Sequence, residues 1–266
     1  MARTTVPQVI KAKGQRKLCM LTAYDSAMAF FVDQCEIDMI LVGDSLAMAA
    51  LGQVDTLSVT MEDMIHHTLA VSRVANQSLV IADMPFMSYQ ASVEQAVSNA
   101  GRMLKEGRAG AVKVEGGESI FPHIQGMVKA GIPVMGHLGL TPQSIAQLGG
   151  YKVQGRGSAG EKILQEAGRL EEAGCFSLVL EAVPPGLASR ITSSLSIPTI
   201  GIGAGPDCDG QVLVINDLLG MNTKFTPRFV KKYADLAGII TKALQRYRRE
   251  VQSGDFPDAS HCYKDD

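Results

Sequence analysis

Residues 38–45 read Asp-Met-Ile-Leu-Val-Gly-Asp-Ser, a run of four large apolar residues that ends in a glycine and two polar residues. A strand of a parallel sheet is covered on both faces and is apolar throughout, whereas a half-exposed strand alternates apolar with polar residues. The run Ser-Leu-Val-Leu at 177–180 has the same character. These stretches therefore predict buried parallel strands, each ending where polar side chains begin.

Eight such runs recur along the chain, and helix-length amphipathic segments separate them. We expect strands at 17–22, 38–42, 79–82, 111–114, 132–136, 177–180, 197–202 and 211–215. We expect helices at 61–74, 93–106, 120–130, 160–173 and 229–247, with a short extra helix at 4–13 before the first strand. Strands that alternate with helices over one domain length favour a closed barrel. The predicted fold is a single (β/α)₈ TIM barrel in the α/β class.

The barrel is predicted to form one domain over residues 1–266, with a loose tail from about residue 253. The tail is rich in Gly, Pro, Asp and Ser and carries little apolar content. An open, doubly wound sheet is the alternative fold. It is disfavoured because no Gly-rich turn follows the first strand, where a dinucleotide site would require one.

The composition is that of an ordinary globular enzyme, with 46% hydrophobic and 20% charged residues. The formal net charge of −2 argues against a surface for nucleic acid or anionic membrane, because both require a clustered basic excess. The five cysteines form no CxxC pair, and residues 1–17 lack the apolar core of a secretory signal. No apolar stretch reaches the roughly 18 residues of a membrane helix. We therefore expect a soluble, cytoplasmic protein.

Ionisable or polar residues stand at the ends of five successive predicted strands, and barrel active sites lie at these carboxyl ends. They are Asp44, Ser45, Asp83, Lys113, Glu115, His137 and Glu181. Singly, each has an ordinary explanation, since a polar residue after a strand often only caps the next helix. Lys113 and Glu115 differ, because they stand at i and i+2 of an apolar strand and face the same side. Inward charges are unfavourable unless they are paired or bound to a metal.

Three of these residues, Asp44, Asp83 and Glu115, are carboxylates, which could pair with Lys113 or bind a metal ion. Oxygen ligands with positions left open for water and substrate suit Mg²⁺ better than Zn²⁺. Such an ion would chelate a 2-oxo acid and stabilise the enolate formed from it. Lys113 would add positive charge near the same oxygens, and Glu181 is the carboxylate best placed to move a proton. The pattern predicts enolate chemistry on a small α-keto acid, with a Schiff base on Lys113 as the chemical alternative.

A glycine-rich segment, residues 201–205, follows the seventh predicted strand. In many barrels the backbone N–H groups of this region bind phosphate, which predicts a phosphate site here. An equally favoured interpretation is a tight, close-packed turn that lines the pocket. The acidic residues Asp207 and Asp209 that follow would repel an anion, so they favour the close-packed turn. His66 and His67 are adjacent in a predicted helix and point in different directions, so a joint metal site is not expected.

Six runs of the sequence are distinctive when they are taken together. They are MLTAYD at 20–25, VGDSLAM at 42–48, DMPFM at 83–87, VKVEGG at 112–117, GHLGLTPQ at 136–143 and the segment 201–211. In this order, over roughly residues 3–250, they resemble the ketopantoate hydroxymethyltransferase family. The resemblance implies transfer of a hydroxymethyl group from 5,10-methylenetetrahydrofolate to 3-methyl-2-oxobutanoate, through a Mg-stabilised enolate. The product would be ketopantoate (2-dehydropantoate), for pantothenate and coenzyme A synthesis.

The resemblance also implies roles for individual residues. One Mg²⁺ per subunit would lie among Asp44, Asp83 and Glu115. The keto acid would be bound by Asp44, Ser45, Asp83 and Lys113, with His137 lining the pocket and Glu181 as proton acceptor. A homo-oligomer, commonly a decamer, is implied as well. Two departures from the family pattern, Asn216 for histidine and Arg228 for lysine, could alter the pocket rim or folate handling but not the reaction class.

Two other functions compete with this one. Another Mg-dependent enolate-forming lyase or decarboxylase of the phosphoenolpyruvate/pyruvate superfamily would share the carboxylates but would need no folate. A barrel that has kept its pocket as a ligand sensor or scaffold is the non-enzymatic alternative. The complete set of charged residues argues against the sensor, because a decayed enzyme usually loses some of its catalytic charges.

Overall fold

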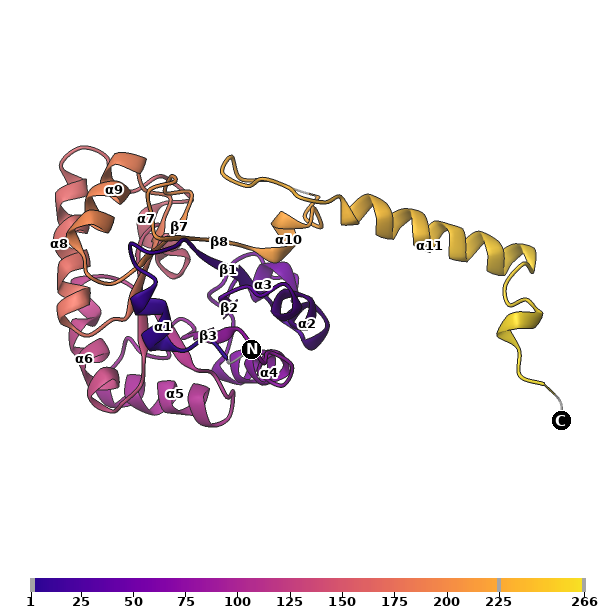
Figure 1. Cartoon of the computed structure of the whole chain (residues 1–266), viewed down its shortest axis with the longest axis horizontal. Coiled ribbons are helices and arrows are strands. Elements are labelled where there is room, and N and C mark those ends of the chain that lie inside the picture. The colour runs from indigo at the N-terminus through magenta and orange to yellow at the C-terminus, as the bar shows by residue number, and fades with distance from the viewer. Residues whose placement is uncertain (1–2, 224–225, 265–266) are drawn as a thin grey trace. The chain divides into compact units, whose positions relative to one another are not determined.

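The computed structural model describes residues 3–223 and 226–264, and within them eight parallel strands close into one barrel (Figure 1). The strands are β1 (Leu18–Thr22), β2 (Met39–Val42), β3 (Leu79–Asp83), β4 (Ala111–Glu115), β5 (Val134–Gly139), β6 (Ser177–Glu181), β7 (Thr199–Ile202) and β8 (Gly210–Leu213). They follow one another around the barrel in chain order, and β8 pairs with β1 to close it. The predicted barrel is confirmed, with small shifts at the strand ends.

Most helices of residues 1–215 lie around the outside of the barrel (Figure 1). The α-helices are α1 (Val6–Lys11), α2 (Ser26–Gln34), α3 (Leu46–Ala49), α4 (Met61–Ser72), α5 (Val93–Lys105), α6 (Phe121–Lys129), α7 (Ile145–Leu148), α8 (Ala159–Glu172), α9 (Pro185–Ser194), α10 (Ile215–Leu218) and α11 (Leu236–Ser253). The 3₁₀ helices are η1 (Glu118–Ile120), η2 (Pro142–Ser144) and η3 (Ala259–His261). Side chains at N-caps help to start them: Asp25 accepts from the Met28 N–H, and Ser92 from the Gln95 N–H. These bonds satisfy first-turn N–H groups that have no partner inside the helix.

The predicted helix pattern is wrong near the end of the chain. The helix expected at 229–247 begins only at Leu236, after the Asp235 side chain accepts from the Gly238 N–H, and it continues to Ser253. Among the described residues, no helix separates β7 from β8, which residues 203–209 connect directly. The tail expected from about residue 253 contains η3, where Asp258 accepts from the Ser260 N–H.

The chain divides into two compact units, residues 1–215 and 216–266. The first unit holds all the described strands, so the barrel is complete within it. The second holds α11 and η3, and its Phe256 ring packs edge-on against Tyr247. Asn216 lies in α10, and Arg228 lies in the non-helical stretch before α11. A single domain over residues 1–266 stays a prediction.

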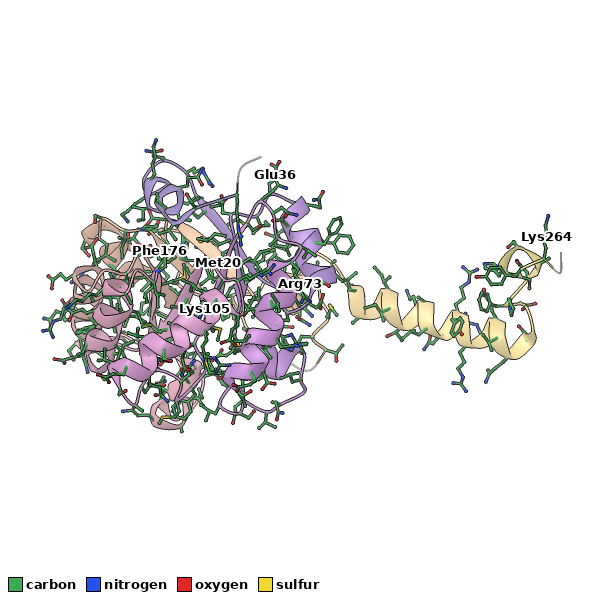
Figure 2. All side chains as sticks on the ribbon, turned by 90° about the horizontal axis from the view of Figure 1, so that it is seen from below. Met20, Glu36, Arg73, Lys105, Phe176 and Lys264 are labelled. Carbon is green, nitrogen blue, oxygen red and sulfur yellow. The ribbon has the colours of Figure 1, made fainter. Side chains whose placement is uncertain are left out.

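Apolar side chains from the strands and from α1 fill the barrel. The core cluster consists of Val9, Ala12, Leu18, Met20, Met39, Leu41, Leu79, Ile81, Ala111, Met135, Phe176, Val179, Ile200 and Val212. Figure 2 labels Met20 and Phe176 among the side chains of the barrel unit. Complete burial of one large apolar side chain contributes roughly 1.5–3 kcal/mol, which is why these strands are apolar along their length. Every helix among the described residues is too short or too polar to cross a membrane.

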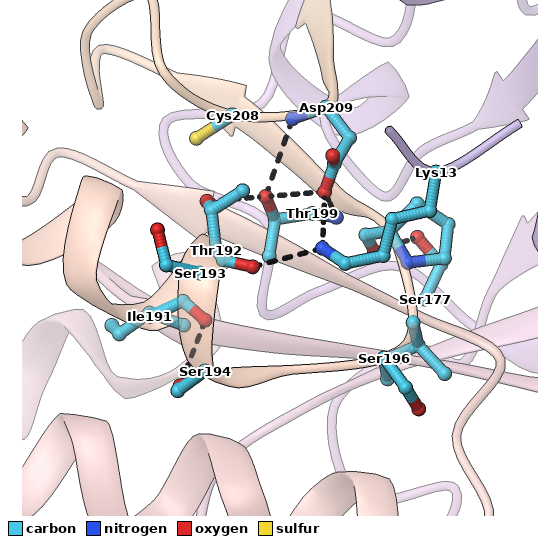
Figure 3. Close-up of polar contacts among 12 residues, drawn as sticks. Lys13, Ser177, Ile191, Thr192, Ser193, Ser194, Ser196, Thr199, Cys208 and Asp209 are labelled. Atoms are coloured by element: carbon cyan, nitrogen blue, oxygen red, sulfur yellow. Dashed lines mark hydrogen bonds and ion pairs between the residues drawn. The ribbon is translucent and has the colours of Figure 1, made fainter. Parts of the chain in front are cut away.

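A polar network closes the amino end of the barrel, opposite the predicted site (Figure 3). Asp209 Oδ2 accepts from Lys13 Nζ at 2.8 Å and from the Thr199 N–H at 2.9 Å. Lys13 also donates to the Thr192 carbonyl at 2.9 Å, and the Thr192 and Thr199 hydroxyls lie 2.7 Å apart. The network joins the segment after α1 to α9, β7 and the residue before β8. It therefore fixes the β7–β8 connection, which has no helix of its own.

Candidate active site

The residues predicted at the strand ends form a continuous series of contacts at the carboxyl end of the barrel. Strand register accounts for two of the pairs, because Asp83 lies opposite Lys113 and Glu115 lies opposite His137. Within β4, Lys113 and Glu115 face the same side, and Lys113 Nζ lies 3.5 Å from Glu115 Oε1. The series ends at Glu181, whose Oε2 lies 3.3 Å from His137 Nε2. Parallel strands thus bring together residues that are far apart in the sequence.

Lys113 is the positive centre of this cluster, with a side chain only 4% exposed. Its Nζ lies 2.8 Å from Asp83 Oδ1 and also pairs with Glu115. Burial alone lowers the pKa of a lysine, but Asp83, Glu115 and Asp44 outweigh burial and hold the Lys113 pKa above its ordinary value. The ammonium is therefore charged at neutral pH. Such an amine supplies fixed positive charge and is a poor nucleophile.

His137 lies between two carboxylates. Its Nδ1 is 3.2 Å from Glu115 Oε1, and its Nε2 faces Glu181 at ion-pair distance without hydrogen-bond geometry. Burial and the charge of Lys113 lower the pKa of His137, but Glu115 and Glu181 outweigh them and raise it to about 9. Burial raises the pKa of Glu115, yet Lys113 and His137 outweigh burial and lower it to about 2. At neutral pH an imidazolium therefore holds two carboxylates in place.

Asp44 is the carboxylate with the least compensation. It is 3% exposed, and burial followed by the negative charges of Glu115 and Asp83 raises its pKa well above the usual range. Among the described residues, Lys113 forms its ion pairs with Asp83 and Glu115 and not with Asp44. Asp44 contributes its backbone N–H to Asp83 Oδ2 at 3.0 Å, which links the ends of β2 and β3. A further cation near Asp44 would relieve this excess of negative charge.

The fit of this cluster to a divalent cation depends on which oxygens are free. Among the described residues, no group of three His, Cys, Asp or Glu side chains is placed to hold a metal ion. Both Glu115 oxygens are engaged, Oε1 near Lys113 and His137 and Oε2 by the Gln143 N–H at 3.0 Å. Asp83 Oδ1 is buried and accepts no hydrogen bond of ordinary geometry, although Lys113 is close. All-oxygen donors, with Asp44 left without a positive partner among the described residues, suit a hard ion such as Mg²⁺.

Ser45 is positioned by a neighbouring tyrosine. The Tyr24 hydroxyl lies 2.9 Å from Ser45 Oγ, and burial raises the pKa of Tyr24 to about 12, so it stays protonated. His67 Nδ1 lies 2.6 Å from the Tyr24 carbonyl, which gives this histidine a structural contact. Gly43 permits the turn, because a Cβ atom there would lie 2.8 Å from Ser45 Oγ and 3.4 Å from Asp83 Oδ2. A larger residue at position 43 would therefore displace the Ser45 hydroxyl.

The glycine-rich segment after β7 is a close-packed turn. A Cβ atom on Gly205 would lie 2.7 Å from Pro185 Cβ, and Gly205 adopts a positive φ of 85°. The Gln211 side chain donates to the Gly205 carbonyl at 2.9 Å, and Lys17 Nζ donates to the carbonyl of Pro206 at 3.2 Å. These contacts give the glycines a packing role, and they favour a close-packed turn that lines the pocket over a phosphate-binding site.

Sequence reasoning missed two buried residues of this cluster, Gln143 and Tyr89. Gln143 is 5% exposed and donates from Nε2 to Asp44 Oδ2 at 2.9 Å. Tyr89 is fully buried, and its hydroxyl lies 2.9 Å from Gln143 Oε1. Both residues lie outside the strands, in segments where polar side chains are usually solvated. The sequence gives no sign that these two face inward.

Comparison with known proteins extends over nearly the whole chain. Residues 3–259 match the family described as ketopantoate hydroxymethyltransferase. The chain is 60% identical to a 3-methyl-2-oxobutanoate hydroxymethyltransferase of Syntrophobacter fumaroxidans, over 97% of this chain and 92% of that protein. It is 58% identical to the enzyme of that name from Moorella thermoacetica, over 99% and 98% of the two chains.

Among solved structures, one match is 2,3-dimethylmalate lyase, a PEP mutase/isocitrate lyase superfamily member. The TM-score is 0.60 at 14% identity, and the match covers 99% of this chain and 93% of the lyase. At this identity the likeness concerns the fold alone. It agrees with the closed barrel of parallel strands in this chain.

Proposed function

Because the chain belongs to the ketopantoate hydroxymethyltransferase family, we propose that it transfers a hydroxymethyl group from 5,10-methylenetetrahydrofolate to 3-methyl-2-oxobutanoate. The product is ketopantoate, which feeds pantothenate and coenzyme A synthesis in the cytoplasm. One observation carries the proposal: a buried lysine lies among carboxylates from three strand ends, with Glu181 at the edge of the cluster. Such a site suits a small anionic substrate on which negative charge develops during reaction.

We place Mg²⁺, one per subunit, on Asp44 and Asp83, with Glu115 completing its acidic environment. When bound, the ion supplies positive charge that stabilises an enolate. Lys113 pairs with Asp83 and Glu115, and His137 pairs with Glu115, so Asp44 has no positive partner among the described residues, which supports a cation at this position.

The protein's own side chains bind the keto acid and hold it in place. The Lys113 ammonium lies where it can attract the substrate's carboxylate and keto oxygens, and burial strengthens that attraction because water does not screen it. The Ser45 hydroxyl, held by Tyr24, is available to the same substrate group. Asp44 and Asp83 border this position through their mutual hydrogen bond.

Glu181 accepts the proton from C3 of the keto acid. Its side chain is 16% exposed, against 2% for Glu115, so it borders the space from which substrate enters. His137 faces Glu181 and fixes its position. Water adds to the methylene carbon of the folate, both bonds from that carbon to N5 and N10 break, and the two nitrogens take up the hydrogens of the water. The C3 carbanion forms its C–C bond to this carbon, the oxygen from water becomes the hydroxyl oxygen, and the proton that Glu181 removed from C3 returns to that oxygen. Tetrahydrofolate is released with ketopantoate.

Product analysis tests the proposed function. Metal-free enzyme titrated with Mg²⁺ is expected to form tetrahydrofolate and ketopantoate in equal amounts, and EDTA is expected to stop both. Chromatography of the products formed with and without methylenetetrahydrofolate distinguishes the hydroxymethyltransferase from the competing functions. Consumption of the keto acid without folate would instead support a lyase or decarboxylase, and substrate binding without turnover would support a sensor.

We further propose that the enzyme is a homo-oligomer, a decamer by its family resemblance. Helix α11 supports this, since it has no buried residue among those described and yet carries an apolar stripe. Ile240, Leu244, Tyr247 and Val251 recur with the 3–4-residue spacing that places them on one face. A helix with one apolar face packs that face against another apolar surface. A second copy of the chain supplies it.

Charge in this stripe is expected to disrupt the oligomer. Leu244→Glu should convert the assembly to smaller species, because a carboxylate cannot be buried there without a partner. Size-exclusion chromatography with light scattering measures the mass. Gln245→Glu, with the same change of charge at the adjacent position, should leave the mass unchanged. An assembled Leu244→Glu protein would show that α11 does not form the interface.

A further inference from the structure

Gln143 lies in η2, yet its side chain contacts the segments that follow β2 and β3 at the carboxyl end of the barrel. The Nε2 group donates to Asp44 Oδ2 and to the Met84 carbonyl, each at 2.9 Å. The Oε1 atom lies 2.9 Å from the Tyr89 hydroxyl and accepts from Gln90 Nε2 at 3.2 Å. The backbone N–H of Gln143 donates to Glu115 as well.

These contacts fix the amide in one orientation. Both N–H bonds of Nε2 point at acceptors, a carboxylate and a carbonyl, and Oε1 faces donors. Exchanging the oxygen and nitrogen would set Oε1 against Asp44 Oδ2 and the Met84 carbonyl, and both contacts would be repulsive. A donor is therefore held permanently toward Asp44.

Tyr89 contacts the oxygen end of the Gln143 side chain. Its hydroxyl accepts from the Glu115 N–H at 3.0 Å, and the Glu115 carbonyl and Gln143 Oε1 both lie 2.9 Å away. The ring is fully buried, so this hydroxyl is held by packing as well as by hydrogen bonds. Tyr89 thus links the end of β4 to the amide that reaches Asp44.

Asp44 depends on this support more than its neighbours do. Lys113 pairs with Asp83 and Glu115, and His137 faces Glu115 and Glu181. Of the described side chains, Gln143 is the donor that reaches Asp44, and it binds only Oδ2. Oδ1 is left without a donor among the described residues, and its direction is set by the hydrogen bond on the other oxygen.

We propose that Gln143 is a positioning residue that orients the Asp44 carboxylate so that its free oxygen faces a divalent cation, with Tyr89 holding Gln143 in place. This role rests on the proposed function, in which Asp44 is a ligand of Mg²⁺. Partners that orient metal ligands without touching the metal typically change metal affinity by about 10- to 100-fold when they are removed.

Binding of Mn²⁺, followed by electron paramagnetic resonance without substrate, tests the role apart from turnover. Gln143→Met keeps the length of the side chain and removes its donor, and it should weaken Mn²⁺ binding by about 10- to 100-fold. Tyr89→Phe keeps the ring and removes the hydroxyl, and it should weaken Mn²⁺ binding by a smaller factor than Gln143→Met. Gln95→Met makes the same chemical change on the outer helix α5, and its affinity should equal that of the wild type.

The outcomes separate this role from the proposed metal site. Equal Mn²⁺ affinity in the wild type and Gln143→Met would overturn the role of Gln143 alone. No binding in the wild type would overturn the metal site and this role with it. If Gln143→Met does not fold, as judged by circular dichroism, Tyr89→Phe decides, and unchanged affinity there would count against the proposal. A loss of stability with unchanged Mn²⁺ affinity would make Gln143 merely structural.

Discussion

Replacing Lys113 with methionine is expected to lower kcat by about 10²–10³-fold and to destabilise the barrel by about 3–5 kcal/mol. The two effects have one cause. The Lys113 ammonium is buried between Asp83 and Glu115, so its removal leaves buried carboxylates without their cation. In the reaction that we propose, the same charge faces the oxygens of the keto acid, where negative charge increases. Methionine has a similar length and no charge, so it separates charge from packing.

Guanidinium unfolding and steady-state kinetics at pH 7 measure the two effects of Lys113→Met. The control is Lys162→Met on α8, where the side chain is 73% exposed and pairs with Glu166 at 3.9 Å. That change should alter the free energy of unfolding by no more than about 0.5 kcal/mol and leave kcat unchanged. An active, stable Lys113→Met protein would contradict the central position given to this charge.

The raised pKa of Lys113 also bears on the Schiff-base alternative. An imine forms from the neutral amine, and the carboxylates around Lys113 favour its charged form. Borohydride reduction in the presence of substrate is therefore expected to leave Lys113 unmodified, as mass spectrometry of the tryptic peptides would show. Covalent trapping on Lys113, with activity that survives EDTA, would reverse this assignment.

Glu181→Gln is expected to abolish exchange of the C3 proton of 3-methyl-2-oxobutanoate with solvent deuterium, and to lower kcat by about 10²–10⁴-fold. Glutamine keeps the shape of the side chain but cannot accept a proton. Binding of the keto acid should persist, because Lys113, Ser45 and the two aspartates are untouched. Proton NMR in deuterium oxide follows the exchange, and calorimetry measures the binding.

Glu118→Gln is the matched control for this exchange experiment. Glu118 is a glutamate of η1 whose side chain is 69% exposed and pairs with Arg169 at 3.2 Å. Its variant should exchange the C3 proton at the wild-type rate. Wild-type exchange in Glu181→Gln would assign the base to another group, whereas loss of both binding and exchange would indicate that Glu181 helps to hold the substrate.

The fold was predictable because its signal is local. Runs such as 39–42 and 177–180 are apolar throughout, and a strand needs this composition when both of its faces are covered. Helix bounds near the chain end were less predictable. The apolar stripe of α11 resembles that of the segment before it, and only the Asp235 cap shows where the helix begins. The helix-free β7–β8 connection depends on contacts of Lys13 and Asp209, which are 196 residues apart.

The sequence by itself determined that charged residues end five successive strands, and parallel strands of a barrel must bring such ends to one side. It also placed Lys113 and Glu115 on one face through their spacing. Tertiary structure alone decided the partners: Lys113 with Asp83, His137 between two glutamates, and Gln143 on Asp44. The physical reason is that the chemical type of a side chain determines which bonds it can form. Packing of distant segments decides which of those bonds it forms, and whether water competes for them.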